Sequence, residues 1–234
     1  MRRPVVAIHQ PNYLPWIGFF AKARAADVLV LLDDVQLERA GPTQRTRVKA
    51  PEGPRWLTVP VQRTAGNGPA IREAKIAHDG KWDRHHARVL ENAYSRSPGW
   101  GAHGPPILEV LTSGEVLLPV LNERLLGLLF AALGIGTRVV RASDLGPRGE
   151  RGNLGNLELC RRLGAATYLS GSGARAYNDP APFAAAGIDL VYHEFVHPRY
   201  AQPHGPFVPG LSAVDYLFSV PPGRSGGDPS LTAG

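Results

Sequence analysis

Two short, uninterrupted apolar runs near the start of the chain limit the fold more than any other feature. Residues 5–8 and 28–32 contain only apolar side chains and lie on either side of one helical segment, residues 16–26. Within that segment apolar side chains, among them Phe19 and Phe20, recur at the three- and four-residue spacing of a helix face. Strands without polar alternation are typical of parallel sheets, whose two faces are both covered by helices. This part of the chain therefore predicts a strand, a helix and a second, parallel strand.

The second half of the chain repeats this alternation. Its strongest helix spans residues 118–133, where leucines recur on one stripe and Gly134 ends the pattern. Further strands are expected at 137–141, 167–169 and 189–195, and further helices at 154–163 and 181–186. We therefore expect an α/β fold with an open, mainly parallel sheet of about five strands and flanking helices, Rossmann-like or nucleotidyltransferase-like.

A different pattern between the two halves predicts a local insertion. Gly53-Pro54 ahead of a strand-like run favours a small β-hairpin around residues 46–61. Residues 81–94 then place five side chains on one helix face: Trp82, His86, Val89, Leu90 and Ala93. We expect residues 1–220 to form a single α/β domain, and residues 221–234, rich in Pro, Gly and Ser, to be a disordered tail.

The composition favours a cytoplasmic protein with no membrane segment. The longest apolar stretch, residues 116–135, is interrupted by Asn122, Glu123 and Arg124, which a transmembrane helix would not tolerate well. The single cysteine, Cys160, cannot form an intramolecular disulfide, which fits a reducing compartment. Its place between apolar helix positions favours a buried thiol over a nucleophile. We expect no metal site, because one cysteine cannot build a cysteine-rich zinc site and the histidines lack metal-ligand spacing.

Basic residues are concentrated in one segment. Residues 39–75 contain eight basic and two acidic side chains, a difference equal to the net charge of +6 of the whole chain. This concentration favours an anionic partner, such as a phosphate-bearing small molecule, a nucleotide or the phosphopantetheine arm of an acyl-carrier protein. A merely solvated basic surface is the alternative. Nucleic acid is a less favoured partner because aromatic residues are sparse there and no recognised binding motif is present, although tRNA stays open.

The most unusual segment is His-Gln-Pro-Asn-Tyr-Leu-Pro-Trp at residues 9–16, directly after the first strand. Ligands of open parallel sheets bind beyond the carboxyl ends of the strands, where this loop is expected to lie. Pro11 and Pro15 fix φ at two points and so order the polar groups between them. We therefore predict a general base, His9, and four substrate-binding side chains: Gln10, Asn12, Tyr13 and Trp16. The alternative is a turn and helix-cap cluster with Trp16 in the core.

Asp33 and Asp34 follow the second apolar run and are expected at the same edge of the sheet. Successive strand residues point to opposite faces, so at most one of the two carboxylates can face a given ligand. We predict that this one is catalytic, orienting His9 or binding the acceptor amine. A structural ion pair with Arg45 or Arg47 is the alternative.

Two further polar clusters follow later strands. Ser170 and Gly171 open a Gly-rich turn that, with Arg175, suits a phosphate or carboxylate better than a dinucleotide, so no tightly bound cofactor is expected. A tight structural turn is the alternative. The last strand is followed by three residues that we expect to face the first loop across the crevice: His197, Tyr200 and Gln202.

Several motifs in one order resemble the WbqC-like protein family. In the first half the resemblance rests on residues 9–20, Ala-Asp-Val-x-Val-x-Leu-Asp-Asp-Val-Gln at 26–36, Arg-x-Arg-x-Lys at 45–49 and Trp-Leu-Thr-Val-Pro at 56–60. In the second half it rests on Tyr-Leu-Ser-Gly at 168–171 with Tyr177, His-Pro-x-Tyr-x-Gln at 197–202, Phe-x-Pro at 207–209 and Leu-Ser-x-x-Asp-x-Leu-Phe at 211–218. Thr43 and Thr46 stand where the family usually has asparagines.

The resemblance implies a role in the biosynthesis of modified-sugar glycans or specialised metabolites. We expect a transferase that moves an acyl or aminoacyl group from an activated, phosphate-bearing donor, for example a phosphopantetheine thioester, to an amine or hydroxyl, often of a sugar. In this hypothesis the donor's phosphates are held by Arg45, Arg47 and Lys49. The substrate pocket is completed by Ser170, Gly171, Tyr177 and His197.

Two other functions stay open. The first is ATP- and Mg-dependent adenylyl transfer or ligation, because the strand, His-containing loop, helix and second strand also resemble the nucleotidyltransferase superfamily that includes pantothenate synthetase. The two-histidine motif of that superfamily is absent, since His9 has no second histidine nearby. The second is a non-catalytic protein that binds a substrate or a carrier. The sequence does not indicate an oligomeric state.

Overall fold

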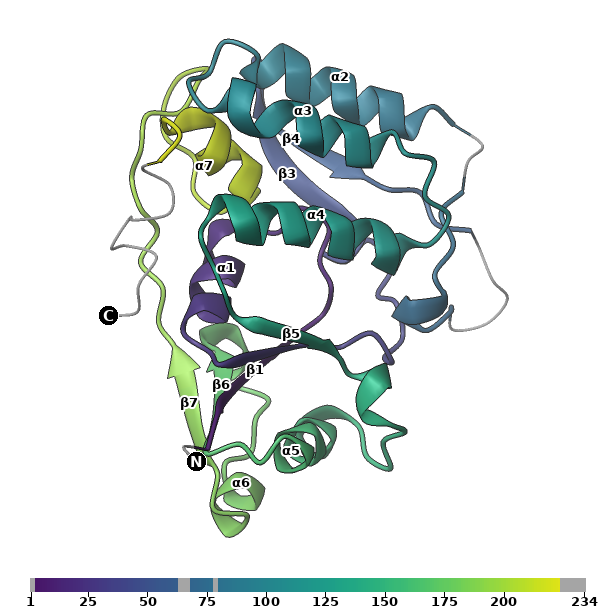
Figure 1. Ribbon diagram of the computed structural model, residues 1–234, viewed down its shortest axis with the longest axis vertical. Helices are drawn as coiled ribbons and strands as arrows, with labels where there is room; N and C mark the ends of the chain where they lie inside the picture. The colour runs from purple at the N-terminus through teal and green to yellow at the C-terminus, as the bar shows by residue number, and fades with distance from the viewer. Residues whose placement is uncertain (1–2, 63–67, 78–79, 224–234) are drawn as a thin grey trace.

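Five parallel strands form the central sheet of the protein (Figure 1). The computed structural model describes residues 3–62, 68–77 and 80–223. The strands run in the order β5-β2-β1-β6-β7. Their bounds are Val5–His9 (β1), Val28–Leu31 (β2), Arg138–Arg141 (β5), Thr167–Gly171 (β6) and Asp189–His193 (β7). The predicted open, parallel sheet of an α/β fold is thereby confirmed.

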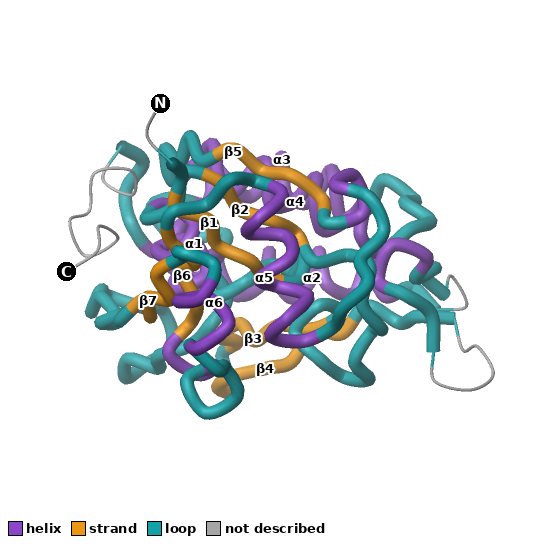
Figure 2. The backbone as a smooth tube through the Cα atoms, turned by 90° about the horizontal axis from the view of Figure 1, so that it is seen from below, coloured by secondary structure: helices purple, strands orange, loops and turns teal. Residues whose placement is uncertain are grey.

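Helices cover both faces of this sheet, which explains its uninterrupted apolar strands. On β1, Val6 and Ile8 point into one hydrophobic core, whereas Ala7 between them points into the other. Helices α5 (Gly152–Arg162) and α6 (Ala181–Ala185) cover the first face, which is the near side in Figure 2. Helices α1 (Ile17–Arg24) and α4 (Leu118–Ala132) cover the opposite face.

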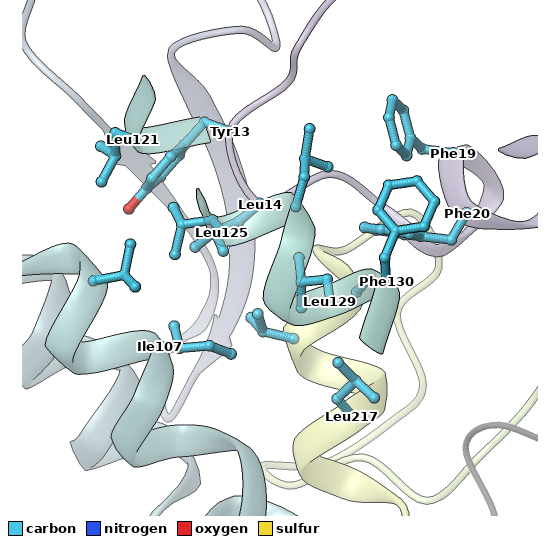
Figure 3. Close-up of a cluster of buried hydrophobic side chains, with 14 of the residues drawn as sticks. Tyr13, Leu14, Phe19, Phe20, Ile107, Leu121, Leu125, Leu129, Phe130 and Leu217 are labelled. Carbon is cyan, nitrogen blue, oxygen red and sulfur yellow. The ribbon is translucent and has the colours of Figure 1, made fainter. Parts of the chain in front are cut away.

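A second layer packs on the outer side of α4. It consists of the antiparallel hairpin β3 (Arg45–Ala50) and β4 (Gly53–Thr58) with the helices α2 (Trp82–Tyr94), α3 (Trp100–Leu111) and α7 (Ala213–Ser219). Three short 3-10 turns, η1 (Ile71–Glu73), η2 (Ser143–Leu145) and η3 (Ser172–Ala174), complete the elements. The larger core joins both layers: side chains of α1, α3, α4 and α7 meet in it (Figure 3). The predicted hairpin is present, and all five side chains predicted for the buried face of α2 are buried.

Helices α3 and α7 were not among the predicted elements. Pro105 and Pro106 lie inside α3, where prolines ordinarily argue against a helix. Tertiary packing holds this segment in place: a Cβ on Gly99 would lie 2.0 Å from the Leu217 carbonyl oxygen, and one on Gly104 would lie 2.6 Å from the Trp100 ring. Glycine at these two positions therefore allows close approach to α7 and to the Trp100 side chain.

A buried carboxylate links the elements of the second layer. Asp215 on α7 accepts hydrogen bonds from the Tyr94 hydroxyl (2.7 Å), the Tyr200 hydroxyl (2.7 Å) and the Gln202 amide (2.8 Å). The Lys49 backbone N–H donates to the Tyr94 hydroxyl (2.8 Å), and its ammonium donates to Gln202 Oε1 and to the carbonyls of residues 205 and 206. We call these five side chains the Asp215 network. It joins α2, β3, α7 and the segment after β7 through one acid.

Three further sequence predictions concern a membrane segment, residues 221–234 and Cys160. Among the described residues, no helix combines the length and apolar character needed to cross a bilayer. The tail predicted for residues 221–234 lies outside the described residues from 224 onward. Cys160 is buried on α5, and burial raises the pKa of its thiol to about 12, so the prediction of a buried thiol is confirmed.

Replacing Asp215 with alanine should lower the free energy of unfolding by about 3 to 5 kcal/mol, the range typical when the partners of a buried charge are left unpaired. Two tyrosine hydroxyls and the Gln202 amide would lose their acceptor. Urea unfolding followed by circular dichroism measures the change. Asp189→Ala, which removes an exposed carboxylate from β7, is the control and should cost less than about 0.5 kcal/mol. Equal losses in the two variants would contradict a structural role for the network.

Candidate functional site

A cavity of about 450 Å³ lies at the carboxyl edge of the sheet, between the ends of β1 and β6. Strand order reverses there: the first half of the chain builds the sheet towards β5, and the second half towards β7. In open α/β sheets this reversal is where ligands bind. We call it the switch-point cavity. Six predicted site residues line it, namely His9, Gln10, Asn12, Trp16, Ser170 and Gly171.

His9 ends β1 with its ring half-buried and packed edge-on against Phe19, at 4.8 Å between centroids. Its Nδ1 is 3.2 Å from the Gln10 carbonyl oxygen. Because a carbonyl only accepts, Nδ1–H is the donor and Nε2 carries the lone pair. Burial and the nearby Lys22 charge lower the pKa of His9 to about 3, so the ring is neutral near pH 7. A neutral imidazole with a free Nε2 can accept a proton from a bound ligand.

Lys22 is a residue of the cavity that the sequence reasoning missed. It lies on α1, its side chain is only 6% exposed, and its ammonium donates to the Ile8 carbonyl at 3.1 Å. Burial lowers its pKa to about 8. The available signal was a lysine preceded by five apolar or glycine residues in a helix that follows the motif loop directly. Charged residues in such a position are rarely buried without a reason.

The far wall of the cavity comes from β6 and β7. Ser170 is buried and accepts a hydrogen bond from the Asn178 amide at 3.0 Å, and Gly171 begins the turn that leads into η3. His193, at the end of β7, is 7% exposed, and its Nε2 has no hydrogen-bond partner within the described part of the chain. Phe195 closes this wall with its ring edge-on to Trp16, at 5.1 Å between centroids. His193 and Phe195 were also missed, because nothing in the sequence fixes how β7 ends.

The basic hairpin forms a second pocket beside the first. This hairpin pocket, about 340 Å³, is lined by Arg45, Arg47 and Trp56 among others, and it shares Asn12, Trp16 and Pro42 with the switch-point cavity. The guanidinium groups of Arg45 and Arg47 lie 4.3 and 5.7 Å from the centroid of the Trp56 ring, which is 51% exposed. Asn12 is 3% exposed, and its Oδ1 has no partner among the described residues. The shared wall makes the two pockets neighbouring parts of one site.

Neither predicted carboxylate faces His9. The Asp33 carboxylate accepts hydrogen bonds from the Ser143 backbone N–H (2.9 Å) and hydroxyl (2.6 Å). Asp34 pairs with the Arg148 guanidinium through two bonds of 2.6 and 2.7 Å. Both acids turn towards the β5 side of the sheet and its following loop, away from the switch point. Asp34 therefore forms a structural ion pair, but its partner is Arg148 and not Arg45 or Arg47, which the alternative had named.

Five other predicted site residues line neither the switch-point cavity nor the hairpin pocket. Lys49, Tyr200 and Gln202 belong to the Asp215 network, where hydrogen bonds already engage them. Tyr177 is 83% exposed and lines neither pocket. His197 packs between the rings of Phe195, Tyr200 and Phe207. The segment after β7 thus reaches the cavity through Phe195 and not through His197.

Tyr13 has a structural place in the motif loop. It is fully buried, and its hydroxyl lies 2.8 Å from His86 Nδ1 on α2. Burial raises the pKa of Tyr13 far above its usual range, so the hydroxyl donates and Nδ1 accepts. Tyr13 also contributes to the wall of the hairpin pocket. The loop is therefore anchored to α2 at the residue that follows Asn12.

Three further contacts fix the backbone of this loop. Leu14 has a positive φ of 41°, a strained conformation for a branched side chain, and its carbonyl accepts hydrogen bonds from the hydroxyls of Thr46 (2.9 Å) and Ser212 (2.7 Å). The Asn122 amide donates to the Pro11 carbonyl at 2.7 Å. The Thr43 hydroxyl donates to Gln10 Oε1 at 2.9 Å, which leaves the N–H groups of Gln10 as donors for a ligand.

The electrostatics of both pockets favour an anion. The residues lining them include Lys22, Arg45 and Arg47 but no aspartate or glutamate. Within the described ranges, no group of three or more His, Cys, Asp or Glu side chains is arranged to hold a metal ion. A small molecule that spans both pockets would therefore meet positive charge, ring nitrogens and amides.

Comparisons with known proteins extend the motif resemblance to the whole chain. The sequence profile of the WbqC-like protein family matches residues 10–225. Rv1507c, an uncharacterized protein of Mycobacterium tuberculosis strain H37Rv, is 35% identical over 219 residues, which cover 92% of this chain and 93% of that protein. No solved structure matches the chain.

The His86 contact makes the stability of the loop's anchor dependent on pH. Burial lowers the pKa of His86 to about 4, below its unfolded value near 6.5, so the unfolded chain binds more protons between these values. Stability should therefore fall as the pH drops from 7 to 5, by roughly 1 to 2 kcal/mol from this group. His86→Gln should show a smaller fall in urea unfolding at the two pH values. The exposed neighbour His85→Gln should keep the wild-type fall, and identical pH dependence in all three proteins would contradict the assignment.

Proposed function

The chain belongs to the WbqC-like protein family, and we propose that it is a biosynthetic transferase acting at the switch-point cavity. The family is linked to the biosynthesis of glycans or specialised metabolites. The proposed reaction moves an acyl or aminoacyl group from an activated, phosphate-bearing donor to an amine or hydroxyl, such as that of an amino sugar. The observation that carries the proposal is the placement of His9, whose Nδ1 is held by the Gln10 carbonyl, in a cavity whose lining includes the Lys22 ammonium and no carboxylate.

His9 would serve as the general base. As the acceptor nitrogen or oxygen attacks the acyl carbon, His9 Nε2 takes the acceptor's proton, and the bond from the acyl carbon to the donor's sulfur or oxygen breaks. The proton then passes from Nε2 to this leaving group, so charge and atoms balance. The Gln10 carbonyl holds Nδ1–H and keeps the ring oriented, and the Gln10 side-chain N–H groups would donate to the carbonyl oxygen that becomes negative.

The hairpin pocket supports a phosphate-bearing donor. Arg45 and Arg47 provide two guanidinium groups on one face of the hairpin, and the exposed ring of Trp56 provides an apolar surface beside them. Arginine binds phosphate oxygens through two parallel N–H donors, which fixes a ligand's orientation as well as its charge. Lys49 has no part in this proposal because its ammonium is engaged inside the Asp215 network. Asp33 and Asp34 likewise have structural partners.

ATP-dependent adenylyl transfer or ligation is the second candidate. It is favoured by the strand order and by the position of the cavity, since doubly wound sheets bind nucleotides at their switch point. The residues lining the cavity include no carboxylate, so a magnesium ion arriving with ATP would be held by the nucleotide's own phosphates.

Turnover assays of a His9→Gln variant test the proposal. Purified protein is incubated with coenzyme A thioesters and amino-sugar nucleotides, and the released thiol is measured with a colorimetric disulfide; the buried Cys160 contributes little background. His9→Gln should lower kcat/KM by about 100-fold or more, the usual contribution of a general base. His85→Gln, at an exposed histidine of α2, is the matched control and should keep wild-type turnover.

The outcomes separate the candidate functions. Full turnover in His9→Gln would remove His9 as the base. Release of AMP or pyrophosphate from ATP, with no release from thioesters, would identify the ATP-dependent reaction instead. Binding of substrates without any turnover in the wild-type protein would favour a non-catalytic binding protein.

A further inference from the structure

The Lys22 ammonium is buried and forms no ion pair with the residues that the structure describes. Its side chain is 6% exposed, and its one hydrogen bond, to the Ile8 carbonyl, leaves two of its three N–H donors without a partner in the described part of the chain. Removing an ammonium from water is costly unless a partner compensates it. No aspartate or glutamate lines the cavity that it faces. A buried cation in this setting is better accounted for by a ligand than by the fold.

The other titratable groups in the cavity also favour an anionic ligand. His9 at the end of β1 and His193 at the end of β7 line the same cavity as Lys22, and burial together with the Lys22 charge lowers the pKa of each ring. Tyr168 from β6 also lines the cavity, and burial raises the pKa of its hydroxyl to about 12, so it stays neutral. The acid next to His193 in sequence, Glu194, is exposed and pairs with Arg175. A negative charge at the centre of the cavity would stabilise the Lys22 ammonium and the protonated forms of the two histidines.

A second observation in the wall of the switch-point cavity is a buried ring nitrogen, His193 Nε2, that lacks a hydrogen-bond partner among the described residues. His193 is buried, it lines the cavity, and its Nε2 has no partner among the described residues. Buried polar atoms of folded proteins are almost always hydrogen-bonded, so an orphan in a cavity wall indicates a missing partner. As the Nε2–H tautomer, His193 would be a hydrogen-bond donor in the wall of the cavity that Lys22 also lines.

We propose that Lys22 and His193 form a binding site for an oxyanion, the carboxylate or phosphate of a substrate, at the inner end of the switch-point cavity. Inorganic oxyanions can occupy this site without catalysis, but its assignment to a substrate rests on the proposed function. Bound there, the anion would also raise the pKa of His9 from its low value towards the range of an effective general base. We therefore expect the donor or the acceptor to carry a carboxylate or phosphate that binds at Lys22 and His193. This group is separate from the donor phosphates expected at the hairpin pocket.

The site should bind anions only while Lys22 is protonated. Burial places the pKa of Lys22 at about 8, so the cation is present below pH 8 and is lost as the pH rises through this value. His9 and His193, whose pKa values are lowered, are already neutral over this range. Affinity should therefore fall about tenfold per pH unit well above pH 8, because binding requires one proton on the lysine.

Anion titrations of three proteins test the site. The probes are sulfate, whose charge does not change between pH 7 and 10, and acetate; chloride keeps the ionic strength constant. Isothermal titration should show that Lys22→Met weakens binding at least about tenfold, whereas Lys22→Arg keeps affinity and loses the decline above pH 8, because a guanidinium stays charged. Lys81→Met, at an exposed lysine before α2, is the matched control and should bind like the wild type. Preference for sulfate would indicate a phosphate-like group, and preference for acetate a carboxylate.

Stability provides an independent measurement. If Lys22 serves a ligand, Lys22→Met should keep the fold and raise Tm by a few degrees, because the variant no longer buries an uncompensated charge. A lower Tm in Lys22→Met, or sulfate and acetate affinities within threefold of the wild type, would overturn the proposal. These titrations need no turnover, so they can fail while the His9→Gln assay succeeds, and the reverse is equally possible.

Discussion

Burial of β1 on both faces is the constraint from which the rest of the architecture follows. A strand with no polar side needs a hydrophobic layer on each face, and α1 with α4, and α5 with α6, supply these layers. The connections that lead from β1 to β2 and on to β5 therefore cross the face covered by α1 and α4, whereas those that lead to β6 and β7 cross the face covered by α5 and α6. The loops after β1 and β6 then diverge at the carboxyl edge and leave the space that becomes the switch-point cavity.

The family motifs have two different roles in this structure: some residues line the two pockets, and others stabilise the second layer. Residues of the first loop line the cavity, and the hairpin arginines line the pocket beside it. Tyr200 and Gln202 of the C-terminal motif instead satisfy a buried acid, Asp215. An acid in the core needs several donors, and their positions have to be specified as closely as those of ligand-binding groups. Motif membership alone therefore does not separate residues that contact substrate from residues that hold the second layer together.

Much of the fold and part of the site could be predicted because they depend on local patterns of apolar and polar residues in the sequence. The apolar runs located β1 and β2, and their parallel pairing placed His9, Gln10 and Asn12 at the carboxyl edge. Directions of side chains could not be predicted in the same way. Asp33 and Asp34 accept hydrogen bonds from Ser143 and Arg148, which lie more than 100 residues later in the chain. No local sequence pattern predicts those contacts. Lys22 was overlooked because a lysine on a short helix is ordinarily exposed, and only the assembled sheet shows that this helix is covered all round.

The backbone of Leu14 connects distant parts of the molecule. Its positive φ is held by a hydroxyl from the hairpin and by the Ser212 hydroxyl, and Ser212 stands immediately before α7, three residues ahead of Asp215. The N-terminal loop and the C-terminal helix therefore form one mechanical unit. Removing residues 211–223 would deprive the loop of a brace and the core of its acid, although none of those residues lines the switch-point cavity. The shape of the cavity thus depends on a segment that is synthesised long after the loop it holds in place.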